Sequence, residues 1–199
     1  MTTWWTSDTH FSHANIIEYC NRPFRDVQEM NEALVEKWNS TVTADDVVFH
    51  LGDLVLGQDI GRQIALTAEL HGDKRLVPGN HDRIAQSFDG RRNAAGFTRM
   101  YEDAGWTILP EQFEHTIGAH RVLVCHFPYR GDSKDHDRYL PHRPVDKGLP
   151  IIHGHVHNEF VERGRQFNVG VDVRQYAPVA EPVILRWLED LIEKTKVHQ

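Results

Sequence analysis

Five short apolar segments of this chain each run directly into a cluster of aspartate, asparagine or histidine residues. In chain order the clusters are Asp8-Thr9-His10, Gly52-Asp53, Gly79-Asn80-His81-Asp82, His126 and Gly154-His155-Val156-His157. Short apolar runs bounded by turn residues are typical of buried strands. Ligands in open α/β sheets bind beyond the carboxyl ends of the strands, so five such ends could carry oxygen and nitrogen donors to one place. The pattern predicts a metal site built from segments far apart in the sequence.

The clusters are informative together rather than singly. Gly-Asp and Asp-x-His occur often by chance, Gly-Asn favours an ordinary turn, and a lone histidine such as His126 is commonly just a buried side chain with its hydrogen bonds made. His155 and His157 are more specific, because alternate residues of a strand share a face and both imidazoles can approach one ion. The chain also holds 14 histidines in 199 residues. Histidine is the commonest metal ligand in proteins, so this excess agrees with metal binding.

The order of the expected elements indicates an α/β fold in one domain, residues 1–199. Strands and helices alternate in the first half: strands at 4–7, 47–50 and 75–77, a helix capped by Asp26, and helical segments at 60–70 and within 83–105, broken at Asp89-Gly90. Strands dominate the second half: a hairpin of 114–117 and 121–125, strands at 151–152 and 167–173, a loop over 130–148 and a last helix from Glu181. Such a series predicts stacked sheets with outer helices.

Composition argues against several classes of protein. Lys and Arg number 22 against 29 Asp and Glu, a net charge of −7, which disfavours a general electrostatic binder of nucleic acid. We find no apolar run of transmembrane length and no secretory signal at the start. The two cysteines, Cys20 and Cys125, share no metal-type spacing and predict no disulfide framework. We therefore expect a cytoplasmic protein.

The five clusters, taken in order, resemble the calcineurin-like metallophosphoesterase superfamily. Its pattern is Asp-x-His, Gly-Asp, Gly-Asn-His-Asp or Glu, His, and Gly-His-x-His, and the match runs from Asp8 to His157. The opening Ser7-Asp8-Thr9-His10-Phe11-x-His13-x-Asn15-Ile16-Ile17 is similar to a small-protein branch found in bacteria and phages. The resemblance implies two stacked mixed β-sheets flanked by helices, a four-layer α/β/β/α sandwich, and agrees with the strand-end pattern.

The resemblance also implies a role for each residue. One divalent ion would be held by Asp8, His10, Asp53 and His157, and a second by Asp53, Asn80, His126 and His155, with Asp53 bridging the two. His81 would face the leaving group of the substrate, and Asp82 would orient His81. Carboxylate, amide and imidazole donors suit Mn, Fe, Zn or Ni, and manganese is our preferred ion. Hydrolysis would proceed by in-line attack of metal-bound hydroxide on phosphorus.

Substrate contacts are less specified by the sequence. His13 and Arg83 are the favoured candidates, His13 from the branch resemblance and Arg83 from its place beside Asp82. Arg22, Arg25 and Arg130 are further candidate phosphate clamps, since a guanidinium group matches phosphate oxygens bidentately. For any single arginine, a solvated surface position is the more common outcome.

Four functions are compatible with these motifs. The preferred one is hydrolysis of a small phosphate ester, with a phosphodiester such as a 2′,3′-cyclic nucleotide favoured over a monoester and no membrane or polymer partner. A nuclease or polynucleotide end-processing enzyme would use the same metals, but the charge of −7 counts against it. A non-catalytic metal-binding scaffold is disfavoured because His81 and all proposed ligands are present. A protein phosphatase is disfavoured by the absence of an evident peptide-binding extension.

Overall fold

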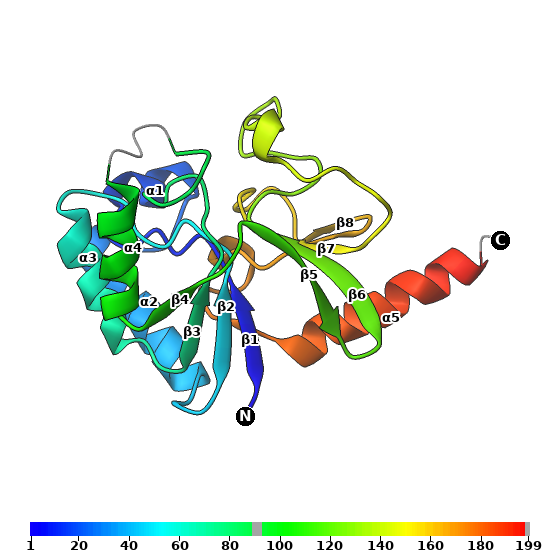
Figure 1. The fold of residues 1–199 in the computed structure, drawn as a ribbon, viewed down its shortest axis with the longest axis horizontal. Coiled ribbons are helices and arrows are strands. Elements are labelled where there is room, and N and C mark those ends of the chain that lie inside the picture. Colours follow the sequence, from blue (N-terminus) through cyan, green and yellow to red (C-terminus); the bar gives the residue numbers. More distant parts are fainter. Residues whose placement is uncertain (89–92, 198–199) are drawn as a thin grey trace.

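The computed structural model describes residues 1–88 and 93–197 and contains two five-stranded mixed sheets (Figure 1). The first sheet has the order β10-β1-β2-β3-β4, formed by β1 (Thr3–Thr6), β2 (Val47–His50), β3 (Asp73–Leu76), β4 (Trp106–Ile108) and β10 (Val179–Ala180). The second has the order β5-β6-β7-β9-β8, formed by β5 (Gln112–Ile117), β6 (His120–Cys125), β7 (Ile151–His153), β8 (Glu162–Arg163) and β9 (Gln166–Asn168). The predicted pair of mixed sheets flanked by helices is confirmed.

Parallel pairing places the carboxyl ends of neighbouring strands at the same edge of each sheet. Strands β1 to β4 are parallel neighbours, with Thr6 opposite His50 and His50 opposite Leu76. In the second sheet β6, β7 and β9 are parallel, whereas β5 and β8 are antiparallel edge strands. The carboxyl ends of β1, β2 and β3 therefore lie at one edge of the first sheet, and those of β6 and β7 at one edge of the second.

Four helices cover the outer face of the first sheet (Figure 1). They are α1 (Ala14–Tyr19), α2 (Val27–Thr41), α3 (Ile60–Leu66) and α4 (Ala94–Asp103). Helix α2 begins as predicted, because the Asp26 carboxylate accepts a hydrogen bond from the Glu29 amide at 2.9 Å and caps the first turn. Its apolar stripe, which includes Met30, Leu34 and Trp38, is buried. The predicted break at Asp89-Gly90 lies outside the described residues.

The core between the sheets is aromatic and β-branched. Trp5 of the first sheet stacks on Phe49 at 4.4 Å between ring centroids, and Val122 and Val124 of β6 belong to the same cluster. Helix α5 (Glu181–Val197) adds Ile184, Trp187 and Leu188 to this cluster. A third, smaller cluster lies on the second sheet. It joins Cys125 of β6 and Ile151 of β7 to Phe127, Tyr129 and Tyr139 of the following loop.

The strand predicted at 167–173 ends early, and this part of the prediction is wrong. Strand β9 stops at Asn168, whose side chain donates to the carbonyls of His157 and Phe160, each at 2.9 Å, and accepts from the Gly170 amide at 2.8 Å. These bonds turn the chain into a short 3₁₀ turn, Val171–Val173. Alternating valines favour a strand, but the asparagine offers the backbone an alternative set of hydrogen bonds.

Within the described part of the chain, we find no helix with both the length and the apolar character needed to cross a bilayer.

Candidate metal centre

The seven predicted ligands converge where the two sheets meet. Asp8 and His10 follow β1, Asp53 follows β2, Asn80 follows β3, His126 follows β6, and His155 and His157 follow β7. Backbone hydrogen bonds tie the loops together: the Asp8 amide donates to the Gly52 carbonyl, and the Gly154 amide to the His126 carbonyl, each at 3.0 Å. These two main-chain contacts fix loops whose bonded residues are 44 (52 − 8) and 28 (154 − 126) positions apart in the sequence.

The Asp53 carboxylate lies at the middle of the cluster. Its Oδ2 atom is 3.6 Å from His10 Nε2, 3.6 Å from His126 Nε2 and 4.0 Å from His81 Nε2. Its Oδ1 atom accepts a hydrogen bond from the His81 amide at 2.8 Å. One oxygen thus faces imidazoles from two different sides, which is the arrangement expected of a carboxylate shared by two cations.

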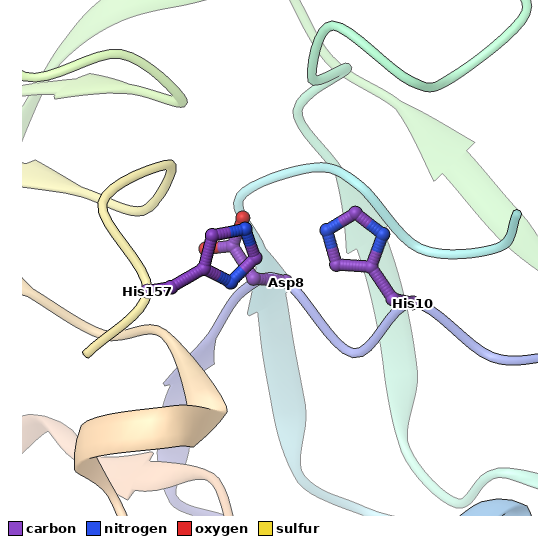
Figure 2. Close-up of side chains that lie close together, drawn as sticks. All are labelled: Asp8, His10 and His157. Carbon is purple, nitrogen blue, oxygen red and sulfur yellow. The ribbon is translucent and has the colours of Figure 1, made fainter. Parts of the chain in front are cut away.

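The first predicted metal group is compact. Asp8, His10 and His157 present ligand atoms that all lie within 4.8 Å of one another, and Figure 2 shows His157 approaching Asp8 from the second half of the chain. Asp8 Oδ1 and both ring nitrogens of His10 are buried, and none has a hydrogen-bond partner among the described residues. Buried polar atoms without partners are costly, so these residues fit a bound cation.

A second trio joins the two predicted groups. Asp8 of the first group and Asp53 and His126 of the second present ligand atoms within 4.8 Å of one another. His126 Nε2 lies 3.1 Å from Asn80 Oδ1 and 3.3 Å from His155 Nδ1. The two trios contain five of the seven predicted ligands, and the other two, Asn80 and His155, contact His126.

Each of three imidazoles has its outward nitrogen fixed by an oxygen acceptor. His126 Nδ1 lies 2.7 Å from the Leu51 carbonyl, His157 Nδ1 lies 2.9 Å from Asp172, and His155 Nε2 lies 3.0 Å from Asp132. An acceptor on one nitrogen places the proton there and leaves the other nitrogen as a lone-pair donor. The remaining nitrogens are His126 Nε2, His157 Nε2 and His155 Nδ1. His126 and His157 would therefore bind a metal ion through Nε2, and His155 through Nδ1.

The backbone of the cluster is unusual. Five of the seven predicted ligands adopt positive φ: Asp8 (57°), His10 (49°), Asp53 (56°), His155 (71°) and His157 (49°). Non-glycine residues rarely enter this left-handed region, and each such residue costs about 1–3 kcal/mol. A concentration of this kind at one place is typical of a functional site held by the surrounding structure.

Burial and the carboxylates set the protonation of the histidines. Burial holds the pKa of His10 well below its ordinary value and lowers the pKa of His155 to about 4, which leaves both rings in the neutral form that binds metals. At His157 burial acts in the same direction, but Asp172 and Asp8 raise its pKa well above its ordinary value. The space between these two carboxylates therefore favours a positive charge, whether a proton or a metal ion.

The two predicted catalytic residues occupy different positions. The His81 side chain is 40% exposed and lines a cavity of about 380 Å³ beside the ligands. The Asp82 carboxylate is buried and accepts hydrogen bonds from the amides of Asp53, Gly79 and Leu54 and from the Tyr101 hydroxyl. Burial and the nearby Asp53 raise the pKa of Asp82 to about 6. In the described residues these contacts fix Asp82 to the loop backbones, so it would position His81 through the main chain rather than through its ring.

Of the two predicted substrate contacts, only His13 reaches the cavity. Its ring centroid is 5.4 Å from that of His10, and burial lowers its pKa to about 4. The Arg83 guanidinium instead stacks on Phe88 at 4.6 Å and is not among the residues that line the cavity. The positive side chains on the cavity wall come from the loop over 130–148: Lys134 and Arg138.

Asp132 and Asp172, which fix two of the ligands, were not identified from the sequence. Asp132 lies in the polar loop, and Asp172 in the segment expected to be a strand. Neither belongs to a short motif, since each acts on a histidine that is distant along the chain. The only signal was indirect: buried ligand histidines usually have an acceptor on the second nitrogen.

Arg22 is a structural residue rather than a phosphate clamp. Its guanidinium is buried and donates to the Asp8 and Thr9 carbonyls at 2.7 and 2.9 Å and to both oxygens of Asp172. We expect Arg22→Met to lower the free energy of unfolding by about 3–5 kcal/mol, because it leaves a buried carboxylate without its cation. Urea denaturation measures this. Arg25→Met is the matched control, since Arg25 is exposed and its ion pair among the described residues is with the partly exposed Glu29; equal stability of the two variants would contradict the assignment.

Gly154 allows close approach of the loops. A Cβ atom there would overlap the Ser7 hydroxyl and the Asp8 carboxylate. We expect Gly154→Ala to displace Asp8 and to lower metal affinity about 10–100-fold, the range seen when residues that orient a ligand are altered. Equilibrium dialysis followed by elemental analysis measures it. Gly61→Ala is the control, because its Cβ would meet only the flexible Met100 side chain; unchanged metal affinity in Gly154→Ala would show that Asp8 is not a ligand.

Fold and site together define a two-sheet sandwich whose Asp and His cluster lies where the strand ends of both sheets meet. The sequence of residues 1–173 matches the family model of the calcineurin-like phosphoesterase superfamily domain. The chain therefore belongs to the calcineurin-like phosphoesterase superfamily, as the resemblance implied.

Relatives from several sources share most of the chain. It is 33% identical to an uncharacterized protein of Methanocaldococcus jannaschii, covering 96% of this chain and 91% of the relative. It is 34% identical to the gene 66 protein of Mycobacterium phage L5, covering 85% and 86% of the two. A protein of unknown function from Aquifex aeolicus has a similar fold, with a TM-score of 0.70 at 21% identity over 94% of this chain and 98% of that one.

Proposed function

We propose that this protein is a dinuclear metal-dependent phosphoesterase that hydrolyses small phosphate esters. The observation that carries the proposal is the position of Asp53 Oδ2, within 3.6 Å of imidazole nitrogens from both predicted ligand groups. Asp8, His10, Asp53 and His157 would hold one divalent ion, and Asp53, Asn80, His126 and His155 the other. Manganese is the preferred ion, since its donor preference includes oxygen and the set is rich in oxygen and imidazole. A cytoplasmic location stays a prediction from the sequence.

When bound, a pair of divalent cations supplies Lewis-acid charge neutralisation and a water of lowered pKa. The residues of the chain perform the remaining tasks. Asp132, Asp172 and the Leu51 carbonyl fix the orientation of three ligand rings. His81, exposed in the cavity and fixed by its amide to Asp53, would donate a proton to the leaving oxygen. His13, held neutral by burial, would contact the ester from the α1 side.

A phosphodiester that carries a flat base, such as a 2′,3′-cyclic nucleotide, is the favoured substrate. The cavity volume of about 380 Å³ is within the range of small-ligand sites. Tyr19 lies on its wall with 69% of its surface exposed, and an exposed aromatic ring stacks on any base with a gain of about 1–3 kcal/mol. These features support a nucleotide over a small alkyl ester.

A substrate panel tests the proposal. We would assay p-nitrophenyl phosphate, bis-p-nitrophenyl phosphate, 2′,3′-cyclic AMP, 3′,5′-cyclic AMP and single-stranded DNA, each with Mn²⁺, Zn²⁺, Ni²⁺ and Fe²⁺. Turnover of the cyclic or aryl diesters without DNA cleavage is the expected result. Cleavage of DNA alone would favour a nuclease, and no turnover by protein shown to hold two ions would favour a scaffold.

A further inference from the structure

The guanidinium of Arg138, on the cavity wall, is held in place by a buried carboxylate. Arg138 donates through Nε and Nη2 to Asp132 Oδ1 at 2.9 and 2.6 Å, and its backbone amide donates to Asp132 Oδ2 at 3.1 Å. Asp132 is itself buried. A guanidinium held on one edge by a buried carboxylate has lost most of its freedom before any ligand arrives, which lowers the cost of binding.

The other edge of this guanidinium is available. Within the described residues, Nη1 of Arg138 has no acceptor at hydrogen-bond distance, and its side chain is 34% exposed on the cavity. Arginine carries five N–H donors in a planar fork. The unused donors therefore point to a ligand acceptor rather than to a structural role alone.

The charge around Asp132 is unbalanced. Its carboxylate is shared by two guanidinium groups, those of Arg138 and Arg143, and by the His155 ring. Lys134 adds an exposed ammonium group on the same wall. Asp132 and its two guanidinium groups together carry one excess positive charge, whereas Asp135 and Asp137 of the same loop and Glu159 of the cavity lining are negative.

Arg138 is also set apart from the reacting centre. Asp132 contacts Nε2 of His155, whereas Nδ1 of that ring faces His126. The contacts that link the guanidinium to the predicted ligand atoms therefore run through a carboxylate and an imidazole ring. Among the described residues, Arg138 lines the same cavity as Asp53 but forms no hydrogen bond or ion pair with Asp53 or with another predicted ligand.

We propose that Arg138, fixed by Asp132, binds a second anionic group of the substrate, separate from the phosphate that reacts. The inference rests on the proposed phosphoesterase function and names its substrate class: a nucleotide that carries an additional phosphate. Lys134 strengthens the same subsite through its charge. A charge-assisted bond of this kind corresponds to a preference of about 10-fold or more for the doubly charged substrate.

A matched substrate pair tests the subsite. Thymidine 5′-(p-nitrophenyl phosphate) and its 3′-phosphorylated form share the reacting diester and the nitrophenolate readout, and they differ only in the second phosphate. In the wild-type protein we expect a KM about 10-fold lower for the 3′-phosphorylated form with similar kcat. Arg138→Gln should bring the KM ratio to about one, and Arg138→Lys should restore part of it. Arg165→Gln removes the same charge from an exposed pair with Asp146 and should leave the ratio unchanged.

Direct binding separates this inference from the proposed function. Calorimetry with metal-loaded protein would compare thymidine 3′,5′-bisphosphate with thymidine 5′-monophosphate, for the wild type and Arg138→Gln at equal metal content. Absence of turnover with an Arg138-dependent preference for the bisphosphate would reject the proposed function and retain the subsite. Turnover of the diesters with no preference in the wild type, or with the same preference in Arg138→Gln, overturns the subsite and retains the function.

Discussion

Asp53→Asn is expected to abolish phosphoesterase activity, with kcat/KM falling by at least about 10²–10³-fold, the loss typical of one preorganised electrostatic group. The amide keeps the size of the side chain and an oxygen that can accept from the His81 backbone. It removes the charge at the one oxygen that faces His10, His126 and His81 together. Both predicted metal groups should therefore lose affinity, which elemental analysis after dialysis measures alongside the rate.

Asp73→Asn is the matched control for this change. Asp73 lies on β3 of the same sheet, but it is exposed and pairs with Arg75. Its substitution should alter neither the metal content nor the rate. Wild-type turnover by Asp53→Asn would refute the dinuclear centre. Retention of both ions with loss of rate would keep the centre but remove Asp53 from the ligand set.

Thermal stability gives a second readout of the same prediction. A ligand that binds only the folded state raises the free energy of unfolding by RT ln(1 + [L]/Kd). Adding Mn²⁺ to dialysed wild-type protein should therefore raise Tm. The shift should be smaller in Asp53→Asn, because fewer ligands remain, and a full shift in that variant would contradict a bridging role.

The candidate metal ligands could be identified because they belong to short local patterns in the sequence. Each lies within four residues of the end of a short strand, so the strand pattern also indicates where the side chain lies. The topology then brings the strand ends together: β1, β2 and β3 through parallel pairing, and β6 and β7 in the same way. The family pattern added the identity of the cluster, and the geometry agrees with it.

The residues around the ligands could not be predicted in this way. Arg83 was selected because it follows Asp82, but adjacency does not determine direction, and the side chain turns to Phe88. Asp132 and Asp172 act on His155 and His157 across 23 and 15 residues, and neither lies in a patterned segment. Asn168 ended a strand that its valines favoured, because side-chain bonds to the backbone depend on partners brought by the tertiary fold.

Asp82 illustrates the difference between identifying a residue and assigning its role. Its place after Asn80 and His81 singled it out, and the structure places it at the junction of two loops. The Asp82 carboxylate accepts four hydrogen bonds. It thereby fixes the loop of Asp53 against the turn at Gly79. We therefore expect Asp82 to act on His81 indirectly, as a positioning residue, whereas His81 alone of the two lines the cavity.

His81→Asn is expected to leave both ions bound and to lower kcat about 10²–10⁴-fold, the range for loss of a general acid. The ring is 40% exposed and its Nε2 is 4.0 Å from Asp53 Oδ2, so its removal opens no buried cavity. The loss should depend on the leaving group. A basic alkoxide, as released from a 2′,3′-cyclic nucleotide, needs a proton, whereas p-nitrophenolate is stable as an anion. The ratio of wild-type to variant kcat should therefore be much larger for the cyclic nucleotide than for bis-p-nitrophenyl phosphate.

His136→Asn controls for the loss of an imidazole, since His136 is exposed and its contact in the described part of the chain is with exposed Asp135. It should retain the wild-type rate on both substrates. Three measurements decide the role of His81: metal content, kcat on each ester and the ratio between them. Loss of metal in His81→Asn would make it a ligand. An equal loss of rate on both esters, with metal retained, would assign His81 to charge stabilisation at the non-bridging phosphate oxygens, because assistance at the leaving oxygen depends on the basicity of that oxygen.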